Sequence, residues 1–252
     1  GGDIKGRRGV NLPGAYLSIA SLTDKDKKDI EFGLKNKVDF IAFSFVRRPS
    51  DVEELRGILA LAKSDAKIIA KIEDVEAVEN IDKLIELVDG VMIGRGDLGI
   101  EIGAENLPMV QKMIISKCNK VGKPVITATH MLESMIKSAV PTRAEVSDIA
   151  NAILDGTDAI MLSEETTLGD YPVESVEMMT RIALRVEKEY PHTKVFDLLP
   201  MQRGTTDAVT AAVVATAKDI GAKLIVAATT TGHTARKVSR FLSALDRRCR
   251  HQ

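Results

Sequence analysis

Two patterns of apolar residues alternate along most of this chain. Short, nearly continuous apolar runs are typical of buried strands, and apolar residues at every third or fourth position are typical of helices with one buried face. We predict strands at residues 38–45, 67–73, 91–93, 124–130, 158–165 and 223–228. We predict helices at residues 23–37, 50–63, 76–87, 109–120, 143–154 and 205–220, and two more that begin at residues 172 and 235.

This alternation indicates parallel strands covered by helices, either as an open doubly wound sheet or as a barrel. Five predicted strands run into polar residues, which are Ser44 and Arg47, Lys71 and Glu73, Arg95 and Asp97, Thr129 and His130, and Ser163 and Glu165. A barrel gathers its active site from many strand ends, whereas an open sheet uses one switch point. The pattern favours a (β/α)8 TIM barrel, incomplete with about five of eight strands, followed by part of a C-terminal α/β domain.

Composition excludes some classes of partner. The formal net charge is only −1, so no overall field favours nucleic acid or an acidic membrane surface. The two cysteines, Cys118 and Cys249, are far apart in the sequence, which fits a reducing compartment and no metal site. No apolar run approaches the roughly twenty residues of a membrane span. We therefore expect a soluble, cytoplasmic protein with no nucleic-acid or membrane partner.

The segment at residues 94–99, GRGDLG, follows one of the apolar runs, and its glycines predict a loop. Glycines allow close backbone approach, their N–H groups can bind an anion, and Asp97 between them can hold a cation. The simpler alternative is a strand-ending turn in which Asp97 accepts backbone hydrogen bonds.

Lys71 and Glu73 lie two residues apart on one predicted strand, so both side chains leave the same face. In a barrel Asp97 ends the next strand and can meet Glu73 to bind a hard divalent ion, while Lys71 supplies positive charge to a phosphoryl group. The alternative is a Lys71–Glu73 salt bridge with no ligand.

Two further segments could bind anions. Arg7 and Arg8, in a basic loop rich in glycine, are either surface charges or phosphate contacts. Thr229, Thr230, Thr231, Gly232, His233 and Thr234 lie between a predicted strand and a helix. Such a hydroxyl-rich turn is either a helix N-cap or a phosphate site.

Six motifs, in order along the chain, resemble those of pyruvate kinases from Lys5 to about Phe241. They are GVNLPG at 9–14, IAKIE at 69–73, RGDLGIE at 95–101, ATHMLESM at 128–135, PTRAE at 141–145 and GDYP at 169–172. The resemblance implies that residues 1–14 return from a lid domain, residues 15–195 carry barrel strands four to eight, and residues 196–252 begin the C-terminal domain.

The resemblance also implies the reaction and its residues. Pyruvate kinases transfer the phosphoryl group of phosphoenolpyruvate to ADP in glycolysis, giving pyruvate and ATP. By position, Lys71, Thr129 and Arg95 are expected to be catalytic, and Glu73 and Asp97 to bind Mg²⁺ or Mn²⁺. Gly96 and Asp97 are expected to contact the substrate with Lys71 and Thr129, and Arg8 to contact the nucleotide.

Other expectations follow from the family rather than from single residues. Residues 229–234 match a loop that binds a sugar-phosphate effector in some members, K⁺ is expected although its ligands are not in this chain, and the parent is expected to be a homotetramer. The sequence departs from the family pattern at His130, Glu164 and His233. Two alternatives stay open: a Mg²⁺-dependent barrel aldolase or lyase acting on an enolate, and a catalytically inactive fragment that associates when expressed alone.

Overall fold

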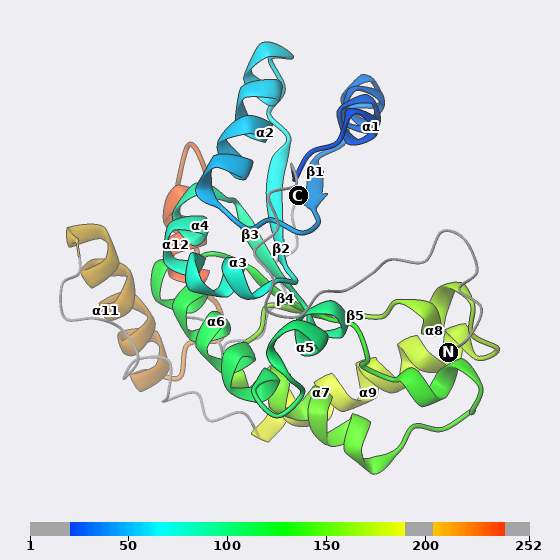
Figure 1. The fold of residues 1–252 in the computed structure, drawn as a ribbon. Coiled ribbons are helices and arrows are strands. Elements are labelled where there is room, and N and C mark those ends of the chain that lie inside the picture. The colour runs from blue at the N-terminus through cyan, green and yellow to red at the C-terminus, as the bar shows by residue number, and fades with distance from the viewer. Residues whose placement is uncertain (1–20, 190–203, 240–252) are drawn as a thin grey trace.

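The structure is a computed structural model that describes residues 21–189 and 204–239. Five strands form one parallel sheet in the order β1-β2-β3-β4-β5 (Figure 1). The strands are β1 (Phe40–Phe43), β2 (Lys67–Ile72), β3 (Gly90–Gly94), β4 (Val125–Ala128) and β5 (Ala159–Met161). Strand order follows chain order without the reversal that defines a doubly wound sheet. This is the winding of a barrel, as predicted.

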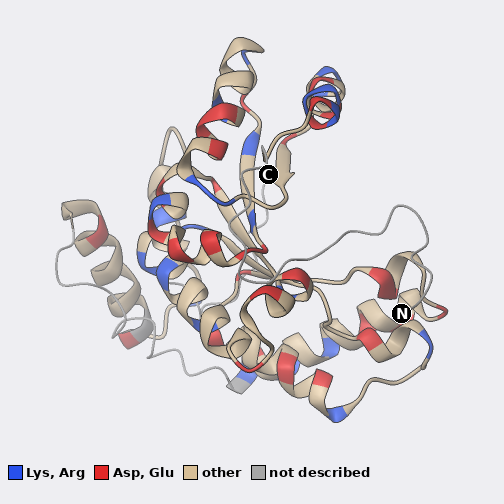
Figure 2. Cartoon of the chain, in the orientation of Figure 1, with Lys and Arg blue, Asp and Glu red and all other residues tan. Residues whose placement is uncertain are grey.

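Helices precede, connect and follow the strands. They are α1 (Asp24–Lys35), α2 (Pro49–Leu61), α3 (Val75–Glu79), α4 (Ile81–Leu87), α5 (Arg95–Ile102), α6 (Leu107–Val121), η1 (Glu133–Ile136), α7 (Arg143–Asp155), α8 (Glu164–Thr167), α9 (Pro172–Glu189), α11 (Thr205–Asp219) and α12 (His233–Ser239). Acidic and basic residues are interspersed on them (Figure 2). In the described part of the chain, no helix is long and apolar enough to cross a membrane.

The alternation of side chains along β2 separates the core from the site. Ile68, Ala70 and Ile72 are fully buried in the core that the helices cover. Lys71 has the opposite parity and keeps about a quarter of its side chain exposed, at 26%. One face of this strand therefore contributes packing, and the other carries polar chemistry at its carboxyl end.

Cys118 belongs to the same buried core, on α6. Burial raises the pKa of its thiol to about 12, with the Asp158 carboxylate adding to the effect. A thiol held neutral in this way is a packing group and not a nucleophile.

The predicted helix at 76–87 is in fact two helices, α3 and α4, which meet at Asn80. The Asn80 side chain donates hydrogen bonds to the carbonyls of Glu76 and Arg47, both at 3.1 Å. An amide side chain that bonds nearby carbonyls competes with regular helix geometry, and the tie to Arg47 requires a tertiary contact.

The helix predicted at residues 50–63 begins one residue earlier than expected. Helix α2 begins at Pro49 with Arg48 as its N-cap. The cap acceptor is Asp51, whose carboxylate receives the backbone N–H groups of Arg47 at 2.9 Å and Arg48 at 3.0 Å. Proline suits the first helical turn because it has no N–H to satisfy there.

The strand predicted at residues 223–228 is absent, since the structure gives this segment no regular secondary structure. Leu224 and Val226 are 72% and 83% exposed. A strand needs a neighbour for its backbone hydrogen bonds, and none of the described residues pairs with this segment. The flanking helices α11 and α12 pack on each other through Ala211, Val214 and Val238.

Candidate active site

The carboxyl end of β2 holds a close pair of opposite charges. The Lys71 ammonium lies 2.7 Å from Glu73 Oε1 and donates a hydrogen bond of 2.9 Å to the Ser44 hydroxyl. The Glu73 side chain is only 4% exposed. The prediction that both side chains leave the same face of the strand is confirmed, and the ion pair that was weighed as the simpler alternative is present.

The end of β1 fixes the other oxygen of Glu73. Phe45 donates its backbone N–H to Glu73 Oε2 at 3.0 Å. Phe45 does this from a left-handed conformation with φ of 52°, which is unfavourable for a bulky residue. Ser44 and Phe45 thus contact Lys71 and Glu73 respectively, a role that sequence spacing alone could not show for Phe45 because it uses a main-chain atom.

Gly94, the last residue of β3, lies directly beside Glu73. The register pairs Ile72 with Ile93, so the two following residues are neighbours. A Cβ atom on Gly94 would lie 2.5 Å from Glu73 Cγ and 2.8 Å from its Oε1. Only glycine leaves room for the carboxylate at this place.

We expect Gly94→Ala to push the Glu73 side chain away from Lys71 and to lower the free energy of unfolding by about 1–3 kcal/mol, as overpacking in cores does. Denaturant unfolding measures this. The matched control is Gly57→Ala on α2, where an added Cβ would meet nothing within 4 Å. The control should gain about 0.5–1 kcal/mol, and equal stability of Gly94→Ala and the unsubstituted protein would contradict the steric argument.

Asp97 lies in the first turn of α5, which is a helix and not the glycine loop that was predicted. Its carboxylate is half-buried, and among the residues that the structure describes it has no hydrogen-bond or ion-pair partner. The turn in which Asp97 merely accepts backbone hydrogen bonds is therefore not what forms. An acidic side chain at a helix N-terminus is favoured by the helix dipole and remains available to a cation.

Thr129 and His130 follow β4 in left-handed conformations, with φ of 68° and 52°. The Thr129 hydroxyl accepts the backbone N–H of Gly96 at 2.7 Å and donates to the carbonyl of Ala128 at 2.6 Å. The structure thus joins the predicted substrate residues Gly96 and Thr129 directly. His130 is mostly exposed, with its Nε2 3.7 Å from a carboxylate oxygen of Glu133.

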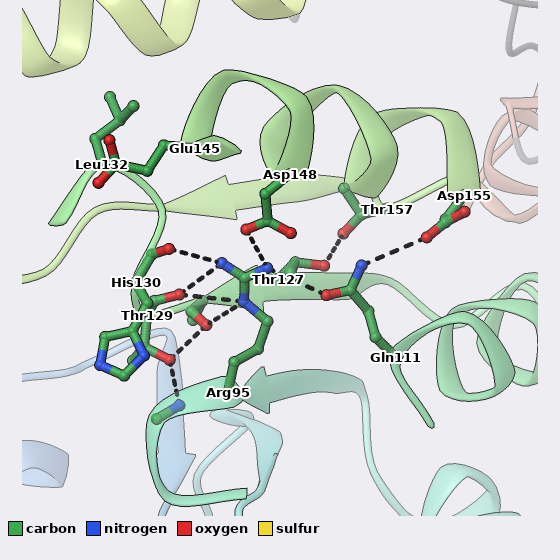
Figure 3. Close-up of polar contacts among 12 residues, drawn as sticks. Arg95, Gln111, Thr127, Thr129, His130, Leu132, Glu145, Asp148, Asp155 and Thr157 are labelled. Carbon is green, nitrogen blue, oxygen red and sulfur yellow. Dashed lines mark hydrogen bonds and ion pairs between the residues drawn. The ribbon is translucent and has the colours of Figure 1, made fainter. Parts of the chain in front are cut away.

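The Arg95 side chain bonds to the end of β4 and to the helix layer. Its guanidinium is buried and lies among the carbonyls of residues 128–130 and the side chains of Gln111 and Asp148, as Figure 3 shows. These contacts cross 16 to 53 residues of sequence, which is why the strand-end pattern gave no indication of them.

Two carboxylates anchor the chain just after Thr129. Glu165, which is 2% exposed, accepts the backbone N–H groups of Leu132 at 3.0 Å and Ser163 at 2.8 Å. Glu145 accepts both the N–H and the hydroxyl of Ser134, together with the same groups of Thr142. Burial acts to raise the pKa of Glu145, but these hydrogen bonds outweigh it and lower the pKa. The lowered pKa favours the ionised form of Glu145, which joins Ser134 to Thr142 through these hydrogen bonds.

No group of three or more His, Cys, Asp or Glu side chains converges anywhere in the described ranges. Glu73 directly follows β2, and Asp97 lies in the first turn of α5, which directly follows the neighbouring strand β3. Two carboxylates with water and substrate oxygens are a normal ligand set for Mg²⁺, which seldom has an all-protein cage. The donor chemistry fits a magnesium site that the substrate completes.

Comparison with known proteins decides the family. Residues 1–176 match the family described as pyruvate kinase, barrel domain, and residues 207–246 match pyruvate kinase, alpha/beta domain. The chain belongs to the pyruvate kinase family. A pyruvate kinase from Bacillus licheniformis is 52% identical over 243 residues, which are 95% of this chain and 42% of that protein. Pyruvate kinase 2 from Synechocystis is 49% identical over 246 residues, 96% of this chain and 40% of that one.

The crystal structure of a pyruvate kinase from Cryptosporidium parvum agrees with the fold. It superposes with a TM-score of 0.87 at 45% sequence identity, covering 92% of this chain and 50% of the other. The chain thus spans half or less of the length of these pyruvate kinases. The predicted fold, part of a (β/α)8 barrel with a C-terminal α/β domain, is confirmed.

Arg8 and residues 229–234 are the two other predicted sites. Arg8 is outside the described residues. Thr229, Thr230 and Thr231 form an exposed turn before α12, and His233 donates its backbone N–H to the Thr231 hydroxyl at 3.4 Å. This contact has the geometry of a helix-start turn, and the effector role expected for pyruvate kinases stays a prediction.

Proposed function

We propose that this chain forms part of a pyruvate kinase that transfers the phosphoryl group of phosphoenolpyruvate to ADP and protonates the enolate to pyruvate. The observation that carries the proposal is the Lys71 ammonium, 2.7 Å from the buried Glu73 carboxylate at a strand end of a pyruvate kinase barrel. A phosphoryl group in transfer is stabilised mainly by positioned charge. Lys71 supplies such a charge on a side chain that is still partly exposed.

Glu73 and Asp97 are the residues proposed to hold Mg²⁺ or Mn²⁺. When bound, the ion neutralises the negative charge that collects on the phosphoryl and enolate oxygens. Glu73 keeps one oxygen on the Phe45 N–H and the other on Lys71, so its orientation is set in advance. Asp97 has no competing partner among the described residues, so cation binding displaces no contact there.

Lys71 is proposed to follow the phosphoryl group as it moves from the enol oxygen of phosphoenolpyruvate to the terminal phosphate oxygen of ADP. Its contacts with Ser44 and Glu73 use two of its three N–H donors, which leaves the third for the substrate. An ammonium is a compact charge on a flexible stem, which suits a group that must track a moving anion. The pyruvate enolate left behind needs a proton, and Lys71 does not have to supply it.

Gly96, Asp97 and Thr129 are proposed to bind the substrate near its carboxylate and enolate. Gly96 N–H donates to the Thr129 hydroxyl at 2.7 Å. A substrate carboxylate that accepts this N–H takes the place of the hydroxyl, and Thr129 is then released toward the enolate. Substrate binding and the supply of a hydroxyl at the reacting carbon are coupled in this arrangement. Arg95 is proposed to serve the same reaction through its contacts with residues 128–130.

Family membership supports the remaining proposals. Arg8 would contact the nucleotide, residues 229–234 a sugar-phosphate effector, and K⁺ would bind through residues outside this chain. The parent would act as a homotetramer in the cytoplasm. The aldolase or lyase alternative uses the same carboxylates, but it requires no cation at the position of Lys71 to stabilise a phosphoryl group.

The test is ATP formation from phosphoenolpyruvate and ADP by the protein that carries this sequence. We expect turnover with Mg²⁺ or Mn²⁺ and none after a chelator has removed the divalent ion. Adding the ion back must restore the rate. Divalent-dependent enolisation of pyruvate without any phosphoryl transfer would instead support a lyase-type enzyme, and activity unaffected by the chelator would contradict the metal assignment.

A further inference from the structure

Arg95 holds three consecutive carbonyl groups at the end of β4. Its Nε donates to the carbonyls of Ala128 at 3.3 Å and Thr129 at 3.1 Å, and one terminal nitrogen donates to Thr129 at 2.7 Å and His130 at 3.1 Å. The residue is 5% exposed. A planar fork of five donors suits such a cluster, whereas an ammonium cannot match it.

The remaining terminal nitrogen of Arg95 binds side chains from the helix layer. It donates to Asp148 on α7 at 2.6 Å and to Gln111 on α6 at 3.3 Å. Gln111 in turn donates to Asp155 at 3.4 Å. Asp148 balances the buried charge, since an unpaired guanidinium is costly to bury. All three nitrogens of the guanidinium therefore have protein partners, and none is directed to substrate.

The backbone that Arg95 grips is unfavourable by itself. Thr129 and His130 have φ of 68° and 52°, and each left-handed residue other than glycine costs about 1–2 kcal/mol. Thr129 is β-branched, which makes this conformation a true outlier. Such backbone persists only where the surroundings over-determine it, and the Arg95 fork is the contact that bonds to both residues.

The conformation of Thr129 sets the direction of its hydroxyl. That hydroxyl lies between the N–H of Gly96 at 2.7 Å and the carbonyl of Ala128 at 2.6 Å. Arg95 contacts the Ala128 carbonyl as well, and Gly96 is the next residue after Arg95 in the chain. The Arg95 guanidinium and the Thr129 hydroxyl therefore donate to the same carbonyl, that of Ala128. The hydroxyl also accepts the N–H of the residue that follows Arg95.

We propose that Arg95 is a positioning residue that acts through Thr129: it holds residues 129 and 130 in left-handed conformations and so places the Thr129 hydroxyl against Gly96. This deepens the proposed function, on which the role of that hydroxyl rests. Arg95 then contributes to turnover without touching substrate, in contrast to the catalytic role expected from the resemblance. The competing explanation is that Arg95 only stabilises the helix layer. In that case its bond to Asp148 would matter, and its bonds to the carbonyls of residues 128–130 would not.

Amide hydrogen exchange at Gly96 tests the placement without requiring activity. Losing the acceptor of a hydrogen bond worth 0.5–1.5 kcal/mol should raise local exchange by roughly tenfold. We expect this increase in Arg95→Lys, as in Thr129→Ala. Asp148→Asn should leave Gly96 near the rate of the unsubstituted protein, because the carbonyl contacts remain. Unchanged exchange in Arg95→Lys, or an equal increase in Asp148→Asn, would overturn the proposal.

The control for an arginine that bonds to a carbonyl and a carboxylate is Arg56→Lys, although the Arg56 side chain is 41% exposed. Arg56 also donates to a carbonyl, that of Leu87 at 3.0 Å, and to a carboxylate, that of Asp89 at 2.7 Å. It lies on α2, beside the amino end of β3. This variant should leave Gly96 exchange unchanged, and an increase there would show that the exchange reports general loosening and would overturn the assignment to Arg95.

A double-mutant cycle tests the same coupling in turnover. If Arg95 acts through Thr129, the double variant with Arg95→Lys and Thr129→Ala should lose no more kcat than Thr129→Ala alone, within about threefold, because coupled residues are not additive. The KM for ADP should stay unchanged. Multiplicative losses in kcat would overturn the proposal. Absence of any phosphoryl transfer in the unsubstituted protein would remove the proposed function, while the exchange result would still decide the role of Arg95.

Discussion

Replacing Lys71 with methionine is expected to lower the rate of phosphoryl transfer by about 10²- to 10³-fold, the usual loss for one well-placed charge stabiliser. Proton exchange between pyruvate and water should fall far less. Transfer needs the ammonium to neutralise charge as the phosphoryl group moves, whereas enolisation depends on the carboxylates and on Thr129. The measurements are ATP formation and exchange of the pyruvate methyl protons into deuterated water, on the same preparation.

The matched control is Lys67→Met, at the amino end of the same strand. Lys67 and Lys71 share one face of β2 but lie four residues apart. We expect the control variant to keep both half-reactions. If Lys71→Met slowed the two half-reactions equally, the ion pair with Glu73 would serve only to hold the strand end, and the assigned role of Lys71 would be wrong.

Substituting Asp97→Asn is expected to raise the concentration of Mg²⁺ that gives half-maximal rate by about 100-fold or more. Loss of outer-shell partners alone costs 10–100-fold in metal affinity, and Asp97 is proposed as a direct ligand. Asp97 is a clean target because the described residues offer its carboxylate no other partner. The measurements are rate against Mg²⁺ concentration, and Mn²⁺ binding by electron paramagnetic resonance without turnover.

Glu73→Gln should weaken metal binding as well, but it also removes the charge that faces Lys71 at 2.7 Å. Its effect on rate is therefore expected to exceed its effect on Mn²⁺ affinity. The control is Asp82→Asn, because the Asp82 carboxylate pairs with Lys117 on the helix surface and lies outside the site. An Asp97→Asn protein with unchanged Mn²⁺ affinity would show that this carboxylate is not a ligand.

Sequence periodicity predicted what depends on single strands and helices. The two-residue spacing of Lys71 and Glu73 was enough to place both on one face, because a strand alternates its side chains strictly. Short apolar runs that alternate with helical patterns predicted the five parallel strands. Element ends were less well predicted: β1 is only four residues, Phe40–Phe43, because the chain turns into the left-handed Phe45 that Glu73 holds.

What sequence could not predict are contacts between residues far apart in the chain. The glycines at 96 and 99 favoured a loop, yet they lie in α5, where Gly96 is held by Thr129 from 33 residues away. Arg95 was grouped with the strand-end residues, and its partners became visible only with α6, α7 and β4 in place. The segment 223–228 has the composition of a strand, but pairing rather than composition makes a strand.

The residues with left-handed conformations at the strand ends lower the stability of the protein but hold the groups proposed to serve turnover. Glycine at positions 45, 129 or 130 would relieve an unfavourable φ, but it would also free the backbone that orients Glu73 and the Thr129 hydroxyl. A selection for heat resistance alone would accept such changes, and a selection that requires catalytic turnover would reject them. Screens that score only melting temperature would therefore lead variants of this barrel toward inactivity at three known positions, which should be held constant in any library.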